Sequence, residues 1–297
     1  MRLRIPSTLP VALPPISRYI ASMSKPDKKS KSQTLAAKAD KYKLYLKSVQ
    51  EPGFEIDFFT RVFREHFKRK PVILREDFCG TAAVCAEWVK SDPKRIAVGV
   101  DLDPEPLAWG MKHILAKLKP AQLQRVELVK ADVRDSHQTK ADILAAQNFS
   151  FFLFTTRDAL RAYFAAAHSH LKREGLMVLD MFGGSECHEE NYSDKIKKKH
   201  FTYIWEHARF DPTTHLATFH IHFKFPDGSK LKNAFSYDWR MWSIPEVREL
   251  LLEAGFKAVH VYWEGTDKKT GEGDNDFRIR KHIEPDPAWI AYIVAVR

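Results

Sequence analysis

Cysteine is scarce in this sequence: three in 297 residues are too few for a disulfide framework. Cys79 and Cys85 are six positions apart, so they do not form a C-x-x-C redox motif, and Cys187 stands alone. None of the three belongs to a pair with the spacing of metal ligands. A reducing compartment is the simpler interpretation, so we expect a cytoplasmic protein without a metal site.

Long hydrophobic runs are also missing. No stretch approaches the ~20 apolar residues that cross a bilayer. A composition of 44% hydrophobic and 29% charged residues is typical of a globular chain long enough to bury a full core. We therefore expect a soluble protein with no membrane partner.

Positive charge is abundant, but it is confined to one end of the chain. Residues 1–50 contain eleven of the 48 basic residues and two of the 38 acidic ones, which gives this segment a net charge of +9 and the remainder +1. A nearly neutral core has no overall field to attract a polyanion. The distribution argues against a nucleic-acid partner.

The first 26 residues contain no acidic side chain, three arginines and five prolines. Segments that are rich in arginine and poor in acids can be mitochondrial transit peptides, so a mitochondrial location is the alternative to a cytoplasmic one. The prolines oppose the amphipathic helix that such a peptide needs. We expect residues 1–35 to form a disordered basic tail, with a targeting segment as the alternative.

Residues 36–70 are expected to form two helices that precede the main domain. Apolar or aromatic residues recur at helical spacing at Tyr42, Tyr45 and Val49, and Pro52-Gly53 separates this stretch from a second periodic one over 54–67. The aromatic stripe of the second helix is most simply explained by core packing.

From residue 71 to residue 297 we expect one domain. Short apolar runs alternate with helical segments, which predicts a Rossmann-like, doubly wound α/β fold with a mostly parallel sheet covered on both faces. The expected strands are 72–74, 96–100, 126–129, 141–146 and 176–180, and the expected helices are 82–90, 104–119 and 158–172.

After Asp180 the pattern becomes antiparallel. Strands are expected at 202–209, 217–225 and 230–239, which together make a β insertion at about 200–240. A helix over 245–254 and a closing antiparallel hairpin of 259–263 and 289–296 complete the domain.

Polar residues follow the first four expected parallel strands. Gly80 lies in the turn after the first, Asp101 ends the second, Asp132 follows the third and Asn148 the fourth. Ligands of open α/β sheets bind at this edge, where an acid after the second strand can accept hydrogen bonds from ribose hydroxyls. Gly80 allows a ligand to approach the backbone closely.

These segments resemble the motifs of class I S-adenosylmethionine-dependent methyltransferases, including an uncharacterised methyltransferase-domain subgroup. The similar stretches are Leu74–Ala82, Ala97–Asp103, Val129–Val133, His170–Asp180 and Trp242–Phe256. The resemblance implies that S-adenosylmethionine is the cofactor. Asp101 would hold its ribose, Asp132 its adenine amino group, and Gly80 with its neighbours the methionine portion.

Arg75 and Tyr45 would contact the methionine carboxylate or cover the cofactor, and an ion pair of Arg75 with Glu76 or Asp77 is an equal alternative. The implied cofactor-binding residues are Tyr45, Arg75, Asp77, Cys79, Gly80, Thr81, Asp101, Leu102, Asp132, Val133 and Asn148.

Three residues are candidates for orienting the methyl acceptor: Asn148, His222 and Tyr237. His220 and His222 share one face of a strand, where they would be a base, a metal pair or ordinary surface. The insertion is aromatic rather than basic, which favours a small molecule, or a single protein side chain or terminus, as the acceptor of a methyl group on nitrogen or oxygen.

Three other functions remain open. A nicotinamide dehydrogenase would need Gly-x-Gly-x-x-Gly in the first turn, where this chain has one glycine. A catalytically silent binding module with the methyltransferase fold is compatible with the altered glycines. An RNA methyltransferase is opposed by the neutral core.

Overall fold

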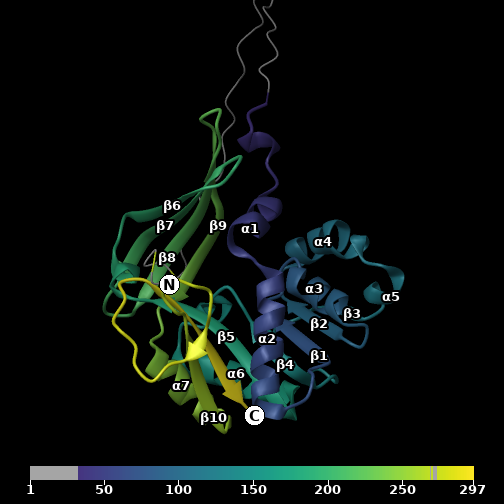
Figure 1. Cartoon of the computed structure of the whole chain (residues 1–297). Coiled ribbons are helices and arrows are strands. Elements are labelled where there is room, and N and C mark those ends of the chain that lie inside the picture. The colour runs from purple at the N-terminus through teal and green to yellow at the C-terminus, as the bar shows by residue number, and fades with distance from the viewer. Residues whose placement is uncertain (1–32, 268, 270–272) are drawn as a thin grey trace, which may run out of the picture. The chain divides into compact units, whose positions relative to one another are not determined.

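The apolar strands of the sequence form a central sheet in the computed structural model of the protein (Figure 1). The structure describes residues 33–267, 269 and 273–297, so the expected tail lies outside the described residues up to residue 32. None of the helices in these described ranges is long and apolar enough to cross a membrane.

The central sheet has eight strands in the order β11-β10-β12-β5-β4-β1-β2-β3. The strands β1 to β5 are parallel, and β12, β10 and β11 are antiparallel to their neighbours. Their bounds are β1 Ile73–Asp77, β2 Ile96–Asp101, β3 Val126–Lys130, β4 Ala141–Ala146, β5 Leu171–Gly183, β10 Ala258–Trp263, β11 Arg278–Ile279 and β12 Trp289–Val296. The expected doubly wound fold with a closing antiparallel hairpin is confirmed.

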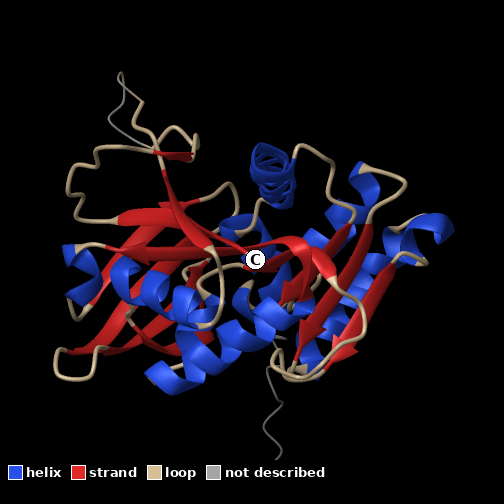
Figure 2. Ribbon diagram, turned by 90° about the horizontal axis from the view of Figure 1, so that it is seen from below, coloured by secondary structure: helices blue, strands red, loops and turns tan. Residues whose placement is uncertain are grey.

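Helices cover both faces of this sheet (Figure 2). In β4, Ile143 and Ala145 belong to a core cluster with α2 and α3, whereas Leu144 and Ala146 belong to one with α6 and α7, because successive strand residues point to opposite faces. The helices are α1 Lys41–Val49, α2 Pro52–Phe67, α3 Ala83–Ser91, α4 Pro104–His113, α5 Pro120–Leu123, α6 Arg157–His170 and α7 Ile244–Glu253.

A second, antiparallel sheet of four strands forms the insertion. Its strands are β6 Tyr192–Lys197, β7 Thr202–Asp211, β8 Leu216–Lys224 and β9 Lys230–Arg240. Tyr203, Ile221 and Phe223 on its inner face form a cluster against which Leu44 and Tyr45 of α1 pack. The helix α1 therefore lies beside β9, as Figure 1 shows.

The structure differs from the sequence-based expectation in several elements. The helix expected over 104–119 ends at His113 and is followed by a 3-10 turn, Leu115–Lys117, that buries Leu115, and by α5. Pro120 begins α5, at the first-turn position that proline favours. The strand β5 is longer than expected and contains Gly175, while β6 and β11 were not predicted.

We predict that Gly110→Ala destabilises the protein, although alanine favours an isolated helix by about 1 kcal/mol over glycine. A Cβ at Gly110 would overlap the backbone carbonyl of Thr81, so α4 and the turn after β1 would have to separate. We expect a loss of about 1–3 kcal/mol in the free energy of unfolding, measured by urea denaturation. Gly53→Ala is the control, because no atom lies within 4 Å of its added Cβ. Equal stability of the two variants would contradict this packing argument.

Candidate functional site

The turn after β1 is held to the end of β2 by one hydrogen bond. The Gly80 N–H donates to Asp101 Oδ2 at 2.7 Å. Phe78, Gly80 and Ala82 have φ values of 58°, 50° and 57°, a region that only glycine enters without strain. No atom lies within 4 Å of the position that a Cβ on Gly80 would occupy. The backbone at Gly80 is therefore open to close approach by a ligand.

Asp101 keeps acceptor capacity at this edge. Its Oδ1 accepts the Asp103 N–H at 2.9 Å, so each oxygen has one backbone donor and lone-pair capacity left. Partial burial raises the pKa of Asp101 above its usual value. Leu102 beside it is 65% exposed. The edge thus presents a carboxylate next to an exposed apolar side chain.

Arg75 does not reach this edge, because it is buried in an ion pair with Asp77. Its Nε donates to Asp77 Oδ1 at 2.7 Å, and its Nη2 donates to the Val133 carbonyl at 2.8 Å. The Tyr163 hydroxyl donates to the other Asp77 oxygen at 3.1 Å. Of the two roles considered for Arg75, the ion pair is the one present. Arg75, Asp77 and Val133 therefore form a buried hydrogen-bonded group that links the end of β1 to the segment after β3.

Asp132 also has a partner already. Two nitrogens of Arg134 donate to its two oxygens, at 2.9 Å and 2.7 Å, and this pairing lowers the pKa of Asp132. The carboxylate remains partly exposed, so an adenine amino group at this position would share it with Arg134. Cys79 and Thr81, which were expected near the cofactor, are buried, at 2% and 7% exposed.

A cavity of about 900 Å³ adjoins the carboxyl ends of β4 and β5. It is also lined by α1, α2, the inner face of the antiparallel sheet and the loop before β12. Of the sequence-predicted site residues, it brings together Tyr45, Asn148 and Tyr237. The Tyr237 hydroxyl is hydrogen-bonded to Tyr45, and burial raises the pKa of both phenols.

Asn148 is positioned in the cavity by Asp180. The two Asp180 oxygens accept the N–H groups of Asn148 and Phe149 at 2.9 Å and 3.0 Å. These bonds hold both residues at positive φ, 57° and 59°, at the end of β4. Burial raises the pKa of Asp180 to about 7.

His222 lies on the opposite face of the sheet from the cavity. On β8 the inward positions are Phe219, Ile221 and Phe223, so alternation turns His220 and His222 outward. His222 is bonded to Glu206 at 2.8 Å and accepts the Asn233 N–H at 2.8 Å. The expectation that His222 orients the acceptor is therefore corrected: of the three interpretations given for the histidine pair, a strand surface is the one observed.

The inward face of β7 supplies Tyr203, Trp205 and His207 to the cavity instead, and α2 supplies Glu55. Tyr203 and Trp205 belong to the aromatic residues of the insertion, whose character predicts a small-molecule site, whereas His207 and Glu55 were not found from the sequence. Which face of β7 points inward depends on its register with β8. Asp180 carried one local signal, its place as the last residue of the expected fifth strand. Within the described ranges, no group of three or more His, Cys, Asp or Glu side chains could hold a metal ion.

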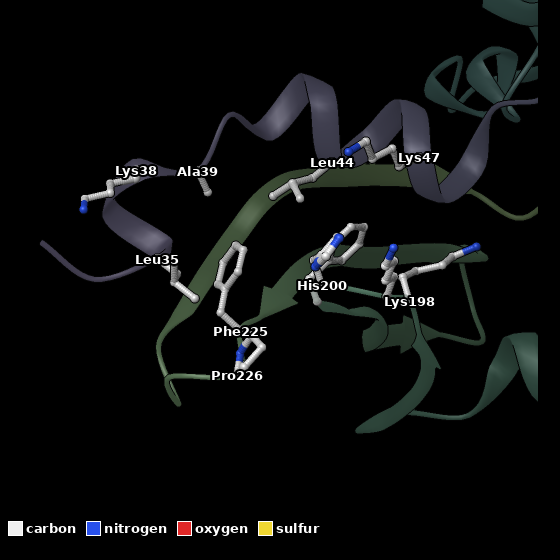
Figure 3. Close-up of a pocket in the computed structure, with 11 residues that line it drawn as sticks. Leu35, Lys38, Ala39, Leu44, Lys47, Lys198, His200, Phe225 and Pro226 are labelled. Atoms are coloured by element: carbon white, nitrogen blue, oxygen red, sulfur yellow. The ribbon is translucent and has the colours of Figure 1, made fainter.

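A second cavity of about 690 Å³ lies between α1 and the ends of the antiparallel sheet (Figure 3). It is apolar, with Leu44 and Phe225 in its wall, and lysines such as Lys38 and Lys198 stand around it. No residue from the carboxyl ends of the parallel strands lines it. It is separate from the candidate site.

Solved structures that resemble this chain include S-adenosylmethionine-dependent methyltransferases. One from Clostridium acetobutylicum is 16% identical, with a TM-score of 0.64 over 86% of this chain and 96% of that one. An amino pentose methyltransferase from Micromonospora echinaspora is 18% identical, with a TM-score of 0.60 over 86% and 95%. A sugar N-methyltransferase from Streptoalloteichus sp. is 17% identical, with a TM-score of 0.59 over 93% and 99%.

No protein-family model and no curated protein matches the sequence. The structural similarity covers at least 86% of this chain, although the sequence identity to these three structures is 18% or less. The chain thus has the Rossmann-like methyltransferase fold that the sequence motifs indicate.

Three buried carboxyl groups at this end of the sheet make stability depend on pH. Burial raises the pKa of Glu55 to about 8 and those of Glu76 and Asp180 to about 7. In the unfolded chain such groups ionise near pH ~4, so the folded state holds more protons between that pH and about pH 8. The free energy of unfolding therefore falls as the pH rises through this range.

We predict a fall of about 1–2 kcal/mol between about pH 7 and pH 8.5, where histidines are largely neutral in both states. Urea unfolding followed by tryptophan fluorescence would measure it. Glu55→Gln should reduce the fall, because the amide does not titrate. A free energy that is constant or rises over this range would contradict the assigned pKa directions.

Proposed function

We propose that the protein is an S-adenosylmethionine-dependent methyltransferase acting on nitrogen or oxygen of a small molecule, or of a single protein side chain or terminus. The observation that carries the proposal is the Gly80–Asp101 hydrogen bond at the carboxyl ends of β1 and β2, on the same edge of the sheet where the larger cavity adjoins β4 and β5. The methyltransferase fold supports it further.

The residues at the strand ends fit the cofactor. Gly80 leaves open space for the methionine portion, and Asp101 has acceptor capacity for the ribose hydroxyls. Asp132 is placed at the next strand end for the adenine amino group, with Leu102 exposed nearby. When bound, S-adenosylmethionine supplies a methyl group carried by a positively charged sulfur, and this sulfur becomes a neutral thioether once the methyl group is transferred. The residues of the chain position the acceptor, exclude water from it and, where needed, remove a proton from it.

The larger cavity is proposed as the acceptor site. Its volume suits a small molecule or one side chain, and its wall combines aromatic side chains with polar ones. Asn148 is held there by Asp180, and the hydroxyl pair of Tyr45 and Tyr237 lies in the same wall. These groups would orient the acceptor atom.

We predict that Asp101→Ala weakens S-adenosylmethionine binding about 10- to 100-fold, the equivalent of about 1.5–3 kcal/mol for lost hydrogen bonds to a charged group. Isothermal titration calorimetry with S-adenosylmethionine, S-adenosylhomocysteine and NAD would measure this in the wild type and the variant. Asp103→Ala is the control, because Asp103 lies two positions after Asp101 and its side chain accepts the Glu105 N–H at the start of α4. If the folded Asp101 variant binds S-adenosylmethionine as tightly as the wild type, Asp101 is not part of the site. If the wild type binds NAD more tightly than S-adenosylmethionine, the result favours a dehydrogenase.

The acceptor class is tested by incubating the protein with methyl-labelled S-adenosylmethionine and fractions of a cell extract. We expect label in metabolites or in one discrete protein, because the cavity is lined by aromatic and acidic side chains rather than basic ones. Label mainly in RNA or DNA would contradict the proposed acceptor, and cofactor binding without any transfer would indicate the silent binding module.

A further inference from the structure

The charges that line the larger cavity are almost all negative. Seven carboxyl side chains line it, against one lysine, Lys195, and one histidine, His207. Lys195 is exposed, and burial lowers the pKa of His207, so the imidazole is neutral and does not offset the acids. Among the described residues that line the cavity, the exposed Lys195 is thus the one cation.

Glu55 has an oxygen with no partner in this wall. Its Oε1 accepts the Tyr292 hydroxyl at 3.0 Å, whereas its Oε2 is buried and accepts no hydrogen bond. A buried acceptor without a donor costs about 1–3 kcal/mol of stability, so its retention calls for a ligand that donates to it. The charge of Asp180, which lines the same cavity, raises the pKa of Glu55 further.

His207 provides a second, independent sign of a polar ligand. The ring is 5% exposed, and its Nδ1 has no hydrogen-bond partner. It comes from β7, on the antiparallel sheet, whereas Glu55 comes from α2. Two unrelated elements thus bring unpaired polar atoms to one cavity.

Aromatic rings make up much of the remaining wall. Twelve Phe, Tyr and Trp side chains line the cavity, among them Trp205, Trp239 and Tyr237. Ring faces attract organic cations, most strongly when water is excluded. Carboxylates together with aromatic rings are suited to an ammonium group and repel an anion.

We propose that the methyl acceptor is a primary or secondary amine that enters this cavity as an ammonium ion and donates to Glu55 Oε2, with Asp180 as the second carboxylate. This inference rests on the proposed methyltransferase function and specifies its substrate class. Asp180 also fixes Asn148, so the ammonium is placed at the end of β4, next to the cofactor edge.

The Glu55 carboxylate also accepts the proton that the ammonium ion must lose before methyl transfer. Beside an ammonium ion the ionised form of Glu55 is favoured, which opposes the effect of burial on its pKa. The ammonium then gives one proton to this carboxylate and becomes a neutral amine with a free lone pair. That pair forms the new nitrogen–carbon bond, while the electrons of the carbon–sulfur bond stay on sulfur. The products are a methylated ammonium ion, neutral S-adenosylhomocysteine and a protonated carboxyl that releases its proton to solvent.

The experiment measures binding of matched ligands to the full chain by saturation-transfer NMR, with and without S-adenosylhomocysteine. The probes are benzyl-, phenethyl- and cyclohexylammonium, the alcohols with the same carbon skeletons, and phenylacetate as an anion. We expect at least one ammonium ion to bind at least tenfold more tightly than its alcohol, and phenylacetate not to bind.

The variant Glu55→Gln keeps an acceptor for Tyr292 and loses the charge, so it should weaken ammonium binding at least fivefold and leave the alcohols unchanged. Glu65→Gln is a matched control: Glu65 lies on the same helix and accepts the Tyr262 hydroxyl at 3.0 Å, but it does not line the cavity. The Glu65 variant should bind the probes as the wild type does.

Alcohols or phenylacetate binding as tightly as every ammonium ion would overturn the proposal, as would a folded Glu55→Gln protein with wild-type ammonium affinity. Failure of the two proposals is distinguishable, because S-adenosylmethionine binding is measured separately. If the protein binds the cofactor but does not prefer ammonium ions, only the proposal of an amine acceptor is contradicted. If it prefers ammonium ions but does not bind the cofactor, the proposed methyltransferase function is contradicted.

Discussion

The buried ion pair between Arg75 and Asp77 is the interaction on which the candidate site depends. Both side chains are almost fully buried, at 2% and 0% exposed, and 2.7 Å separates their charged atoms. The pair joins the end of β1 to Val133 after β3 and, through Tyr163, to α6. Removing one member of such a pair costs about 3–5 kcal/mol, because the other charge stays buried alone. The turn that presents Gly80 follows directly from this clamped strand end.

The site combines two structures with different physical origins. The parallel sheet brings strand ends together, which gives the Gly80–Asp101 edge its polar groups. The larger cavity instead needs the antiparallel sheet and the two N-terminal helices. The helix α1 links both parts: its Tyr42 packs on Trp109 of α4 and on Phe235 of β9, with ring centroids 5.4 Å and 5.9 Å apart.

The parts of the fold that could be predicted from the sequence are those with local signals. Periodicity identified the parallel strands, and turn residues identified their ends, so the positions of Asp101 and Asn148 at one edge were predictable. Arg75 was not, because its choice of partner depends on where Val133 and Tyr163 lie. The face of His222 depended on the register of β8, and a register is set by pairing across the sheet. Glu55 and Tyr292, 237 positions apart, had no signal at all.

That long sequence separation has a consequence for how the chain matures during synthesis. Glu55 leaves the ribosome long before Tyr292, whose strand β12 inserts between β5 and β10 in the finished sheet. Until then β5 and β10 have an open edge between them, and one wall of the larger cavity is missing. A nascent chain can therefore assemble the Gly80–Asp101 edge first and completes the larger cavity only when β12 has been synthesised.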